Sequence, residues 1–344
     1  MTETDARLLE VRQWLAHLDL PGLQPASLRP ASADASFRRY FRIDAQAGSF
    51  IIMDAPPAQE DVAPFIHAAT VLAQAGVAVP TIHAADTKRG FLLLTDFGST
   101  TMLARLNAQP ESAKALYAAA SEQLVRLQSG SQTGVFPAYD RQRLMTELRL
   151  FDQWYLARHR NYPLSDQQHQ ALDGVYEALL GNNLAQPAVF VHRDWHSRNL
   201  MVLESPTGDL TGLGVIDFQD ALYGPVTYDL VSLLRDAYVQ WSEEQVIDWA
   251  VRHWQAARSA GIAVHPDFGD FYRDFEWMGL QRHLKVLGIF ARLAIRDNKP
   301  AYLEDMPRVL HYVVQTAARY REFAPLFALL QAIEGRPLRS ALTF

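Results

Sequence analysis

The sequence changes character near residue 100. Residues 28–97 consist of short strand-like runs with one helix among them, whereas the sequence from about Thr101 onward has mostly helical periodicity. One strand-rich stretch, at about 189–218, interrupts the helical part. This order of elements predicts an α+β protein of two lobes, with a small β-rich lobe at 1–97 and a larger helical lobe at 98–344.

The expected elements are short, and turn residues separate them. In the first lobe we expect strands at 28–31, 37–43, 50–54, 81–86 and 91–95, and a helix at about 60–75 that ends at Gly76. In the second lobe we expect strands at 189–191, 200–203 and 213–218. Helical periodicity there covers 110–129, 140–159, 166–182, 227–239, 242–258, 268–296 and 302–333.

Composition excludes several classes of protein. The 344 residues are 49% hydrophobic and 20% charged, so the chain can bury a sizeable core. A net charge of −6 argues against a nucleic-acid partner, and the absence of cysteine excludes disulfides and thiolate catalysis. The acidic N-terminus has helical spacing of its apolar residues and no signal-peptide pattern, and no apolar run is long enough to span a membrane. We therefore expect a cytoplasmic protein without a membrane partner.

The most informative motif is His192-Arg193-Asp194-Trp195-His196-Ser197-Arg198-Asn199. It matches the H-R-D-x-x-x-x-N arrangement of a kinase catalytic loop. In such a loop the aspartate accepts the proton of the attacking hydroxyl, and the asparagine binds a magnesium ion. The spacing therefore predicts Asp194 as the catalytic base and Asn199 as a metal ligand. A polar surface loop is the alternative when this motif is taken alone.

A second motif follows eighteen residues after Asn199. The apolar run Val215-Ile216 leads into Asp217-Phe218-Gln219, where a protein kinase has D-F-G. That aspartate is the other metal ligand, and magnesium needs only one or two carboxylates in addition to phosphate oxygens. The two motifs, in this order and spacing, predict a protein-kinase-like fold that uses ATP and Mg²⁺.

Two further residues are expected to support the catalytic loop. Asp229, in Tyr228-Asp229-Leu230 at the start of a helix, is expected to brace the loop, although a helix-dipole role explains it as well. His192 is also assigned a structural role.

The first lobe departs from the kinase pattern. Its loop at 32–36 contains no glycine, and Met53 occupies the position of the phosphate-binding lysine. We expect Ser36 to contact phosphate and Arg38 or Arg42 to supply the missing charge, unless these arginines are only solvated. Asp96 and Gly98 are expected at the segment that contacts adenine.

The spacing after the second motif excludes a protein substrate. Only twelve residues separate Asp217 from Asp229, which leaves no room for a long activation segment, and position 196 is His rather than Lys. A small hydroxylated substrate fits better. Its expected contacts are Trp195, His196, Arg198, Glu147 and Arg282. The helix at 268–296 is basic, which suits a neutral or acidic sugar better than a polycationic aminoglycoside, although a solvated helix face explains the same residues.

The chain resembles the aminoglycoside phosphotransferase and choline kinase-like superfamily, and more narrowly the bacterial anomeric kinases of N-acetylmuramate and N-acetylglucosamine. The segments that carry this resemblance are DASFRRYFR (34–42), FIIMDAPP (50–57), LLLTDFGSTTML (92–103), HRDWHSRNLMV (192–202) and VIDFQDALYGPVTYDLVSLLRD (215–236).

The resemblance implies transfer of the ATP γ-phosphate to the C1 hydroxyl of an amino sugar in cell-wall recycling. A nucleotidyltransferase would then convert the α-1-phosphate to a UDP-sugar. The alternatives are another small-molecule kinase of the superfamily, acting on an aminoglycoside, choline or a different sugar, and a nucleotide-binding pseudokinase.

Overall fold

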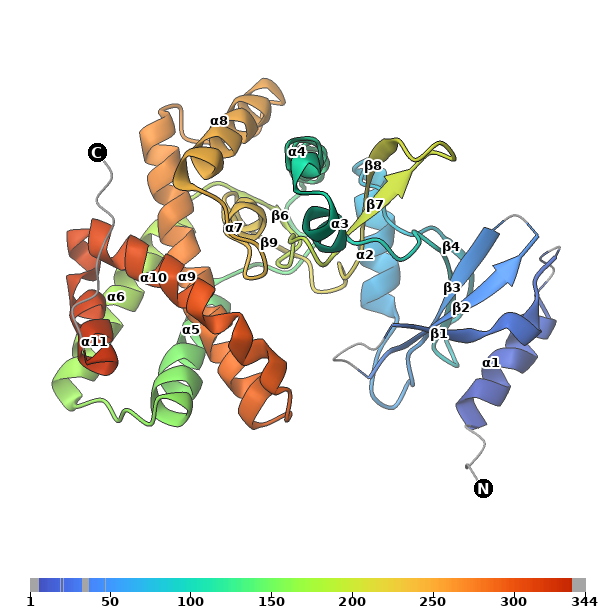
Figure 1. Cartoon of the computed structure of the whole chain (residues 1–344), viewed down its shortest axis with the longest axis horizontal. Helices are drawn as coiled ribbons and strands as arrows, with labels where there is room; N and C mark the ends of the chain where they lie inside the picture. Colours follow the sequence, from blue (N-terminus) through green and yellow to red (C-terminus); the bar gives the residue numbers. More distant parts are fainter. Residues whose placement is uncertain (1–5, 19, 21, 33–36, 47, 336–344) are drawn as a thin grey trace. The chain divides into compact units, whose positions relative to one another are not determined.

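The computed structural model describes residues 6–18, 20, 22–32, 37–46 and 48–335. The chain forms two compact units (Figure 1). We call Met1–Thr100 with Met201–Asp220 the sheet unit, and Thr101–Leu200 with Ala221–Phe344 the helical unit. The expected boundary at 97/98 lies three residues from this division. Residues 201–220, which the sequence analysis assigns to the helical lobe, cluster with the sheet unit instead.

The sheet unit is built on antiparallel strands in the order β1-β2-β3-β5-β4. These strands are β1 (Arg29–Ser32), β2 (Arg39–Ala45), β3 (Gly48–Asp54), β4 (Ile82–Asp86) and β5 (Phe91–Thr95). The other elements of the unit are α1 (Ala6–Ala16), a 3₁₀ turn (Pro25–Ser27), α2 (Ala63–Gln74) and the paired strands β7 (Leu200–Glu204) and β8 (Leu210–Val215). The predicted strand at 91–95 is confirmed to the residue. The other predicted strands differ from the observed strands by a few residues at one or both ends.

Helix α1 covers one face of this sheet (Figure 1). Alternation along β2 places Phe41 and Ile43 on that face, where they pack with Trp14 and other buried residues of α1. The ring centroids of Trp14 and Phe91 are 5.6 Å apart. Burial of each such side chain contributes about 1.5–3 kcal/mol, so this cluster holds α1 on the sheet. The same alternation places Arg42 on the opposite face.

The helical unit contains two paired strands, β6 (Ala188–Val191) and β9 (Leu222–Pro225), among its described helices. The helices are α3 (Met102–Ala108), α4 (Ala113–Ser129), α5 (Arg141–Leu150), a π-helix (Phe151–His159), α6 (Asp166–Ala185), α7 (Tyr228–Leu234), α8 (Glu243–Ser259), α9 (Phe268–Ile295), α10 (Met306–Arg319) and α11 (Ala324–Glu334). Short 3₁₀ turns lie at Pro110–Ser112, Pro300–Glu304 and Arg321–Phe323. Strand β9 and helix α3 are not predicted from the sequence.

The helix predicted over 302–333 is two helices, α10 and α11, so that prediction is wrong in detail. Tyr320 has an extended backbone, with φ −112° and ψ 126°, and its hydroxyl donates to Glu276 Oε2 at 2.6 Å. The apolar periodicity continues across this break, and for that reason the sequence pattern does not reveal it.

Helix α9 lies against α5 and the π-helix. Gly288 of α9 meets the backbone of Leu150, where a Cβ atom would lie 2.3 Å from the Leu150 carbonyl carbon. Only glycine permits this approach. Lys285 and Glu147 each lie three residues before the contact, about one helical turn away on the same side. The close packing therefore sets α9 and α5 at the spacing that the site described below requires.

None of the helices in the described part of the chain has the length and apolar content of a membrane-spanning segment.

Candidate active site

The catalytic loop begins where the buried strand β6 ends, and Asp229 of α7 holds it. The backbone N–H groups of His192 and Arg193 donate to the two carboxylate oxygens of Asp229, at 2.6 and 2.9 Å. Burial raises the pKa of Asp229 to about 7, and the two N–H bonds act in the opposite direction. These are the contacts that a brace for the loop would make.

The loop backbone is strained at the residue before the expected base. Arg193 has a φ of 80°, in the left-handed region that residues with a side chain rarely adopt. The N–H of Asp194 then donates to His192 Nδ1 at 3.2 Å, so this ring nitrogen acts as an acceptor. Asp217 in the sheet unit is also left-handed, with a φ of 66°. Strained backbone concentrates at functional sites, and both sequence motifs contain such a residue.

Asp194 presents a partly exposed carboxylate to cationic groups. Its side chain is 44% exposed, and Oδ1 lies 3.6 Å from Arg282 Nη2 and 4.0 Å from His196 Nε2. Desolvation opposes the negative charge, but Arg282 and then Lys285, His196 and Arg193 lower the pKa of Asp194 below its usual value. Asp194 is therefore ionised at neutral pH, as a proton acceptor must be.

Asn199 is fixed to the same loop. Its Nδ2 donates to the backbone oxygen of Asp194 at 3.1 Å. This bond assigns the amide nitrogen, so that the oxygen, which is the metal-binding atom, is at the other end of the group.

Glu147 of α5 joins the catalytic loop to α9. Its carboxylate accepts from Arg193 Nη2 at 2.6 Å, from Lys285 Nζ at 3.0 Å and from the Tyr139 hydroxyl. Desolvation opposes ionisation, whereas Lys285 and Arg193 lower the pKa of Glu147. Three donors already occupy this buried carboxylate, which argues against its predicted role as a substrate contact. The position of Glu147 favours a role in holding Arg193 and Lys285 in place.

The structure contradicts the prediction that Trp195 contacts the substrate. Trp195 is fully buried and meets the His192 ring edge-on, with centroids 5.5 Å apart. It is a core residue, because no face of the indole is open to a ligand.

His196 and Arg198 instead share one partner, Tyr238. The ring centroids of His196 and Tyr238 are 5.3 Å apart, and the Arg198 guanidinium carbon lies 3.6 Å from the Tyr238 centroid. Between them, Ser197 donates from its N–H and hydroxyl to Asp236 Oδ2, at 2.9 and 2.6 Å. The sequence analysis missed Asp236 and Tyr238, which no motif marks.

The basic helix predicted at 268–296 is α9, but its cations are largely matched by neighbouring groups. Arg282 faces Asp194 and Lys285 faces Glu147. The exposed Arg273 lies 3.2 Å from Asp270, and Arg296 lies 2.7 Å from Asp297. The helix therefore offers less uncompensated charge to a substrate than its sequence indicates.

In the sheet unit, three of the residues expected to contact nucleotide form one cluster. Arg42 donates to the carboxylate of Asp96 at 2.5 and 2.9 Å and to the Gly98 oxygen at 2.9 Å. Ser49 Oγ also donates to Asp96, at 2.6 Å. Met53, at the lysine position, is fully buried. The charge of Arg42 is thus held within the protein by Asp96.

The remaining expected nucleotide contacts lie at the loop before β2. Ser36 lies outside the described residues, whereas Arg38 is described and half-buried.

Asp217 also belongs to the sheet unit. It follows β8 with an exposed side chain, and its Oδ1 accepts from Gln219 Nε2 at 2.9 Å. The next residue, Phe218, is fully buried against Phe65 of α2, with ring centroids 4.8 Å apart. Phe218 therefore anchors the motif while the carboxylate of Asp217 stays accessible, which fits a ligand for a hard cation.

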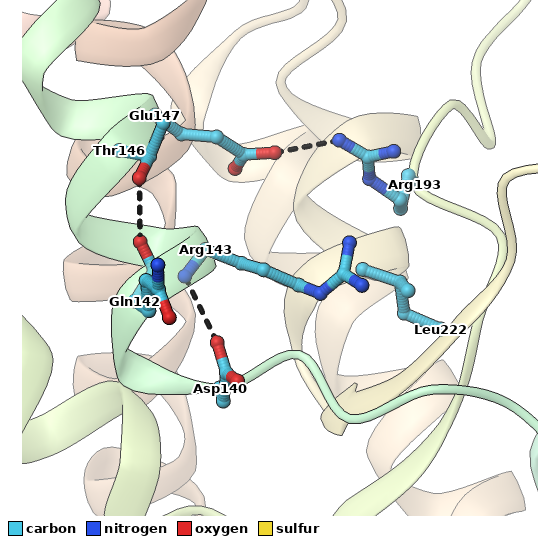
Figure 2. A pocket seen from close by; sticks show the side chains of 7 residues that line it. All are labelled: Asp140, Gln142, Arg143, Thr146, Glu147, Arg193 and Leu222. Carbon is cyan, nitrogen blue, oxygen red and sulfur yellow. Dashed lines mark hydrogen bonds and ion pairs between the residues drawn. The ribbon is translucent and has the colours of Figure 1, made fainter.

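A polar pocket of about 400 Å³ lies in the helical unit beside the catalytic loop (Figure 2). Its lining includes Asp140, Arg143, Thr146, Glu147, Arg193 and Leu222. Figure 2 shows the Glu147–Arg193 ion pair at one end and the long side chain of Arg143 reaching toward Leu222. The sequence analysis missed Arg143.

Comparison with known proteins identifies relatives over nearly the whole chain. Residues 27–268 match the model of the phosphotransferase enzyme family. The chain is 48% identical to an N-acetylmuramate/N-acetylglucosamine kinase of Neisseria meningitidis, over 91% of this chain and 93% of the relative. It is 46% identical to a kinase of the same description from Pseudomonas aeruginosa, over 96% and 97%.

Solved structures share the fold at low sequence identity. One is the ADP-bound aminoglycoside phosphotransferase APH(2'')-Ib, which is 14% identical with a TM-score of 0.56, over 91% of this chain and 99% of that one. The predicted two-lobed, kinase-like α+β fold is confirmed by such neighbours.

Proposed function

The chain belongs to the phosphotransferase enzyme family, and we propose that it is an ATP-dependent sugar kinase that phosphorylates the C1 hydroxyl of N-acetylmuramate and N-acetylglucosamine. The observation that carries this proposal is the environment of Asp194. An ionised, partly exposed carboxylate stands on a braced loop in a chain whose relatives, at 46–48% identity, are kinases of these two sugars.

Asp194 would accept the proton of the attacking hydroxyl. A hemiacetal C1 hydroxyl is more acidic than an ordinary alcohol, so a carboxylate of lowered pKa is a sufficient base for it. Asp229 would keep the loop in place, and Arg282 would keep Asp194 ionised and oriented. The ADP in a structural neighbour supports ATP as the phosphoryl donor.

Electrostatics around the base favour a neutral or anionic substrate over a polycation. Arg193, Arg282 and Lys285 lower the pKa of Asp194, so positive potential surrounds the carboxylate. An aminoglycoside would meet like charge there, which is unfavourable in a partly desolvated site. This observation disfavours the aminoglycoside alternative.

Asn199 and Asp217 are the residues that would hold Mg²⁺. A carboxylate and an amide oxygen, completed by phosphate oxygens and water, form a suitable donor set for this ion. When bound, the ion would neutralise charge on the transferring phosphoryl group.

Replacement of Asp217 tests this assignment. Asp217→Ala should abolish activity and weaken the magnesium dependence of nucleotide binding, because the strongest proposed anionic ligand is lost. Calorimetric titration with ATP in the presence and absence of Mg²⁺ measures this. Asp209→Ala, in the exposed turn between β7 and β8, is the matched control. Unchanged ATP–Mg²⁺ affinity in Asp217→Ala would contradict the metal assignment.

We also propose that a nucleotidyltransferase acts on the product. A sugar 1-phosphate is the substrate that such an enzyme couples to a nucleoside triphosphate, and we propose this step toward UDP-sugars in cytoplasmic peptidoglycan recycling.

A screen of ATP consumption tests the substrate class. The two amino sugars should be turned over, and choline and gentamicin should not. Turnover with choline or gentamicin alone would overturn the sugar assignment. ATP binding without turnover of any alcohol would indicate a pseudokinase.

A further inference from the structure

The pocket beside the catalytic loop contains a cation that has no side-chain partner in the described part of the chain. Arg143 lies on the first turn of α5 with an exposed side chain, and it makes no side-chain ion pair or hydrogen bond with any residue that the structure describes. Other arginines of the same region are paired: Arg141 with Glu177, Arg149 with Asp173 and Arg193 with Glu147. In Figure 2 the guanidinium of Arg143 extends across the pocket toward Leu222.

The carboxylates near the pocket are committed to other groups. Asp140 caps α5 by accepting from the Arg143 backbone N–H at 2.9 Å. Glu147 is shared between Arg193 and Lys285. The charged side chains that line the pocket sum to zero, with Arg143 and Arg193 against Asp140 and Glu147. Within the described residues, Arg143 is nevertheless the lining cation whose guanidinium has no side-chain partner, and Arg193 Nε is buried there without a hydrogen-bond partner. An anionic group that enters the pocket can therefore pair with the Arg143 guanidinium.

The pocket is adjacent to the proposed base along the chain. Arg193, which lines it, directly precedes Asp194, and consecutive Cα atoms are only about 3.8 Å apart. For a substrate to use both features, its hydroxyl must meet Asp194 while another substituent reaches this pocket. N-acetylmuramate differs from N-acetylglucosamine by a lactyl ether on O3 that ends in a carboxylate, so only one of the two sugars has an anion to offer.

We propose that Arg143 binds the lactyl carboxylate of N-acetylmuramate and thereby sets the preference between the two sugars. This inference rests on the proposed function and adds a specificity residue to it. Because Arg143 is exposed and lies outside the ion-pair network of Asp194, N-acetylglucosamine can bind with water in the pocket. A site of this kind accepts both sugars and favours the acidic one.

The test compares kcat/KM for the two sugars in wild type and in Arg143→Gln. The ratio of N-acetylmuramate to N-acetylglucosamine should fall about tenfold in the variant, through a higher KM for N-acetylmuramate, because one charge-assisted contact is lost. Arg141→Gln, two residues away on the same helix and outside the pocket, should keep the wild-type ratio. The methyl ester of N-acetylmuramate, which lacks the charge, should be equally poor with wild type and Arg143→Gln.

Each outcome decides a separate claim. A ratio that is unchanged in Arg143→Gln, or that falls equally in Arg141→Gln, overturns the role of Arg143 and leaves the sugar kinase standing. If wild type turns over neither sugar, the proposed function fails and this inference falls with it. The wild-type preference for N-acetylmuramate depends on its charge. Raising the salt concentration should therefore reduce the kcat/KM ratio of the two sugars in wild type and not in Arg143→Gln.

Discussion

The two units differ in how many polar and charged side chains they bury. Among the described residues of the sheet unit, Asp54 is the only polar or charged residue outside the aromatic class that is buried as a whole, and the side chain of Asp96 is also only 3% exposed. The helical unit buries many, including His192, Asp229, Glu147, Arg282 and Lys285. Burial of a charge is unfavourable unless the charge is paired, and the paired buried charges of the helical unit lie around the catalytic loop. The sheet unit is mainly an apolar scaffold.

The buried Asp54 of the sheet unit has a structural explanation. Asp54 is fully buried and accepts from Arg7 Nε at 3.1 Å and Arg39 Nε at 3.0 Å, so it ties α1 to the sheet. The buried carboxylates of the helical unit instead hold a loop and the cations beside the proposed base. The contrast predicts that loss of the charge of Asp54 affects stability, whereas loss of the charge of Asp194 affects activity.

The largest effect is expected at Asp194. Asp194→Asn should reduce kcat by about 10²–10⁴-fold, because the amide cannot accept the substrate proton. Its side chain is 44% exposed, so thermal stability should stay near that of wild type, and nucleotide binding should persist. Steady-state kinetics, calorimetry with ATP and thermal unfolding measure these properties. Near-wild-type turnover would remove Asp194 from the role of base.

Asp54 should show the opposite pattern. Asp54→Asn leaves two arginines without their carboxylate, and we expect a loss of about 2–4 kcal/mol in the free energy of unfolding, reduced by the partial exposure of both arginines. Asp44→Asn removes an exposed carboxylate that pairs with Arg29 in the same sheet, and it should change stability little. Urea unfolding of both variants checks this. Equal losses of stability in Asp54→Asn and Asp44→Asn would contradict the structural role of the buried Asp54.

The smallest effect concerns acid sensitivity of the helical unit. His253 is buried with its Nδ1 2.9 Å from Ser121 Oγ, and burial lowers its pKa to about 4 from an ordinary 6.5. Between these pH values the unfolded chain binds a proton that the folded chain does not bind. The contribution of neutral His253 to the free energy of unfolding is therefore complete above pH 6.5 and decreases as the pH falls toward 4. At one pH unit below 6.5, one such histidine lowers the free energy of unfolding by about 1 kcal/mol.

His253→Gln should reduce this loss. The difference in unfolding free energy between about pH 7 and pH 5.5 should be smaller in the variant than in wild type. His283, whose pKa burial lowers to about 3, should still contribute a loss of the same sign. An identical pH difference in wild type and His253→Gln would show that this ring is not buried in its neutral form.

The features that the sequence predicts well are those contained in short segments. The catalytic loop places Asp194 and Asn199 five residues apart, and the structure joins them by a hydrogen bond within the loop. The fold class follows from the order of strands and helices, and the long helix at 268–296 is found at Phe268–Ile295. Such features depend on local spacing, which a single sequence contains.

The features that the sequence does not predict are partners that meet only in the folded chain. Glu147 pairs with Arg193 across 46 residues, and Arg42 pairs with Asp96 across 54. Trp195 has an aromatic ring of the kind that binds ligands, yet folding places it in the core. The unpaired state of Arg143 is likewise a property of what surrounds it. The sequence shows which residues are charged or aromatic, but it does not show which charges are paired or which side chains are buried.

The central claim is that Asp194 directs phosphorylation to the anomeric hydroxyl of an amino sugar. Proton-coupled phosphorus NMR of the product formed from N-acetylmuramate and ATP–Mg²⁺ tests it most directly. The account predicts phosphorus coupled to the C1 proton of an α-1-phosphate, with loss of the reducing end and lability to mild acid. Phosphorus coupled to the C6 protons of a sugar that still reduces would contradict it.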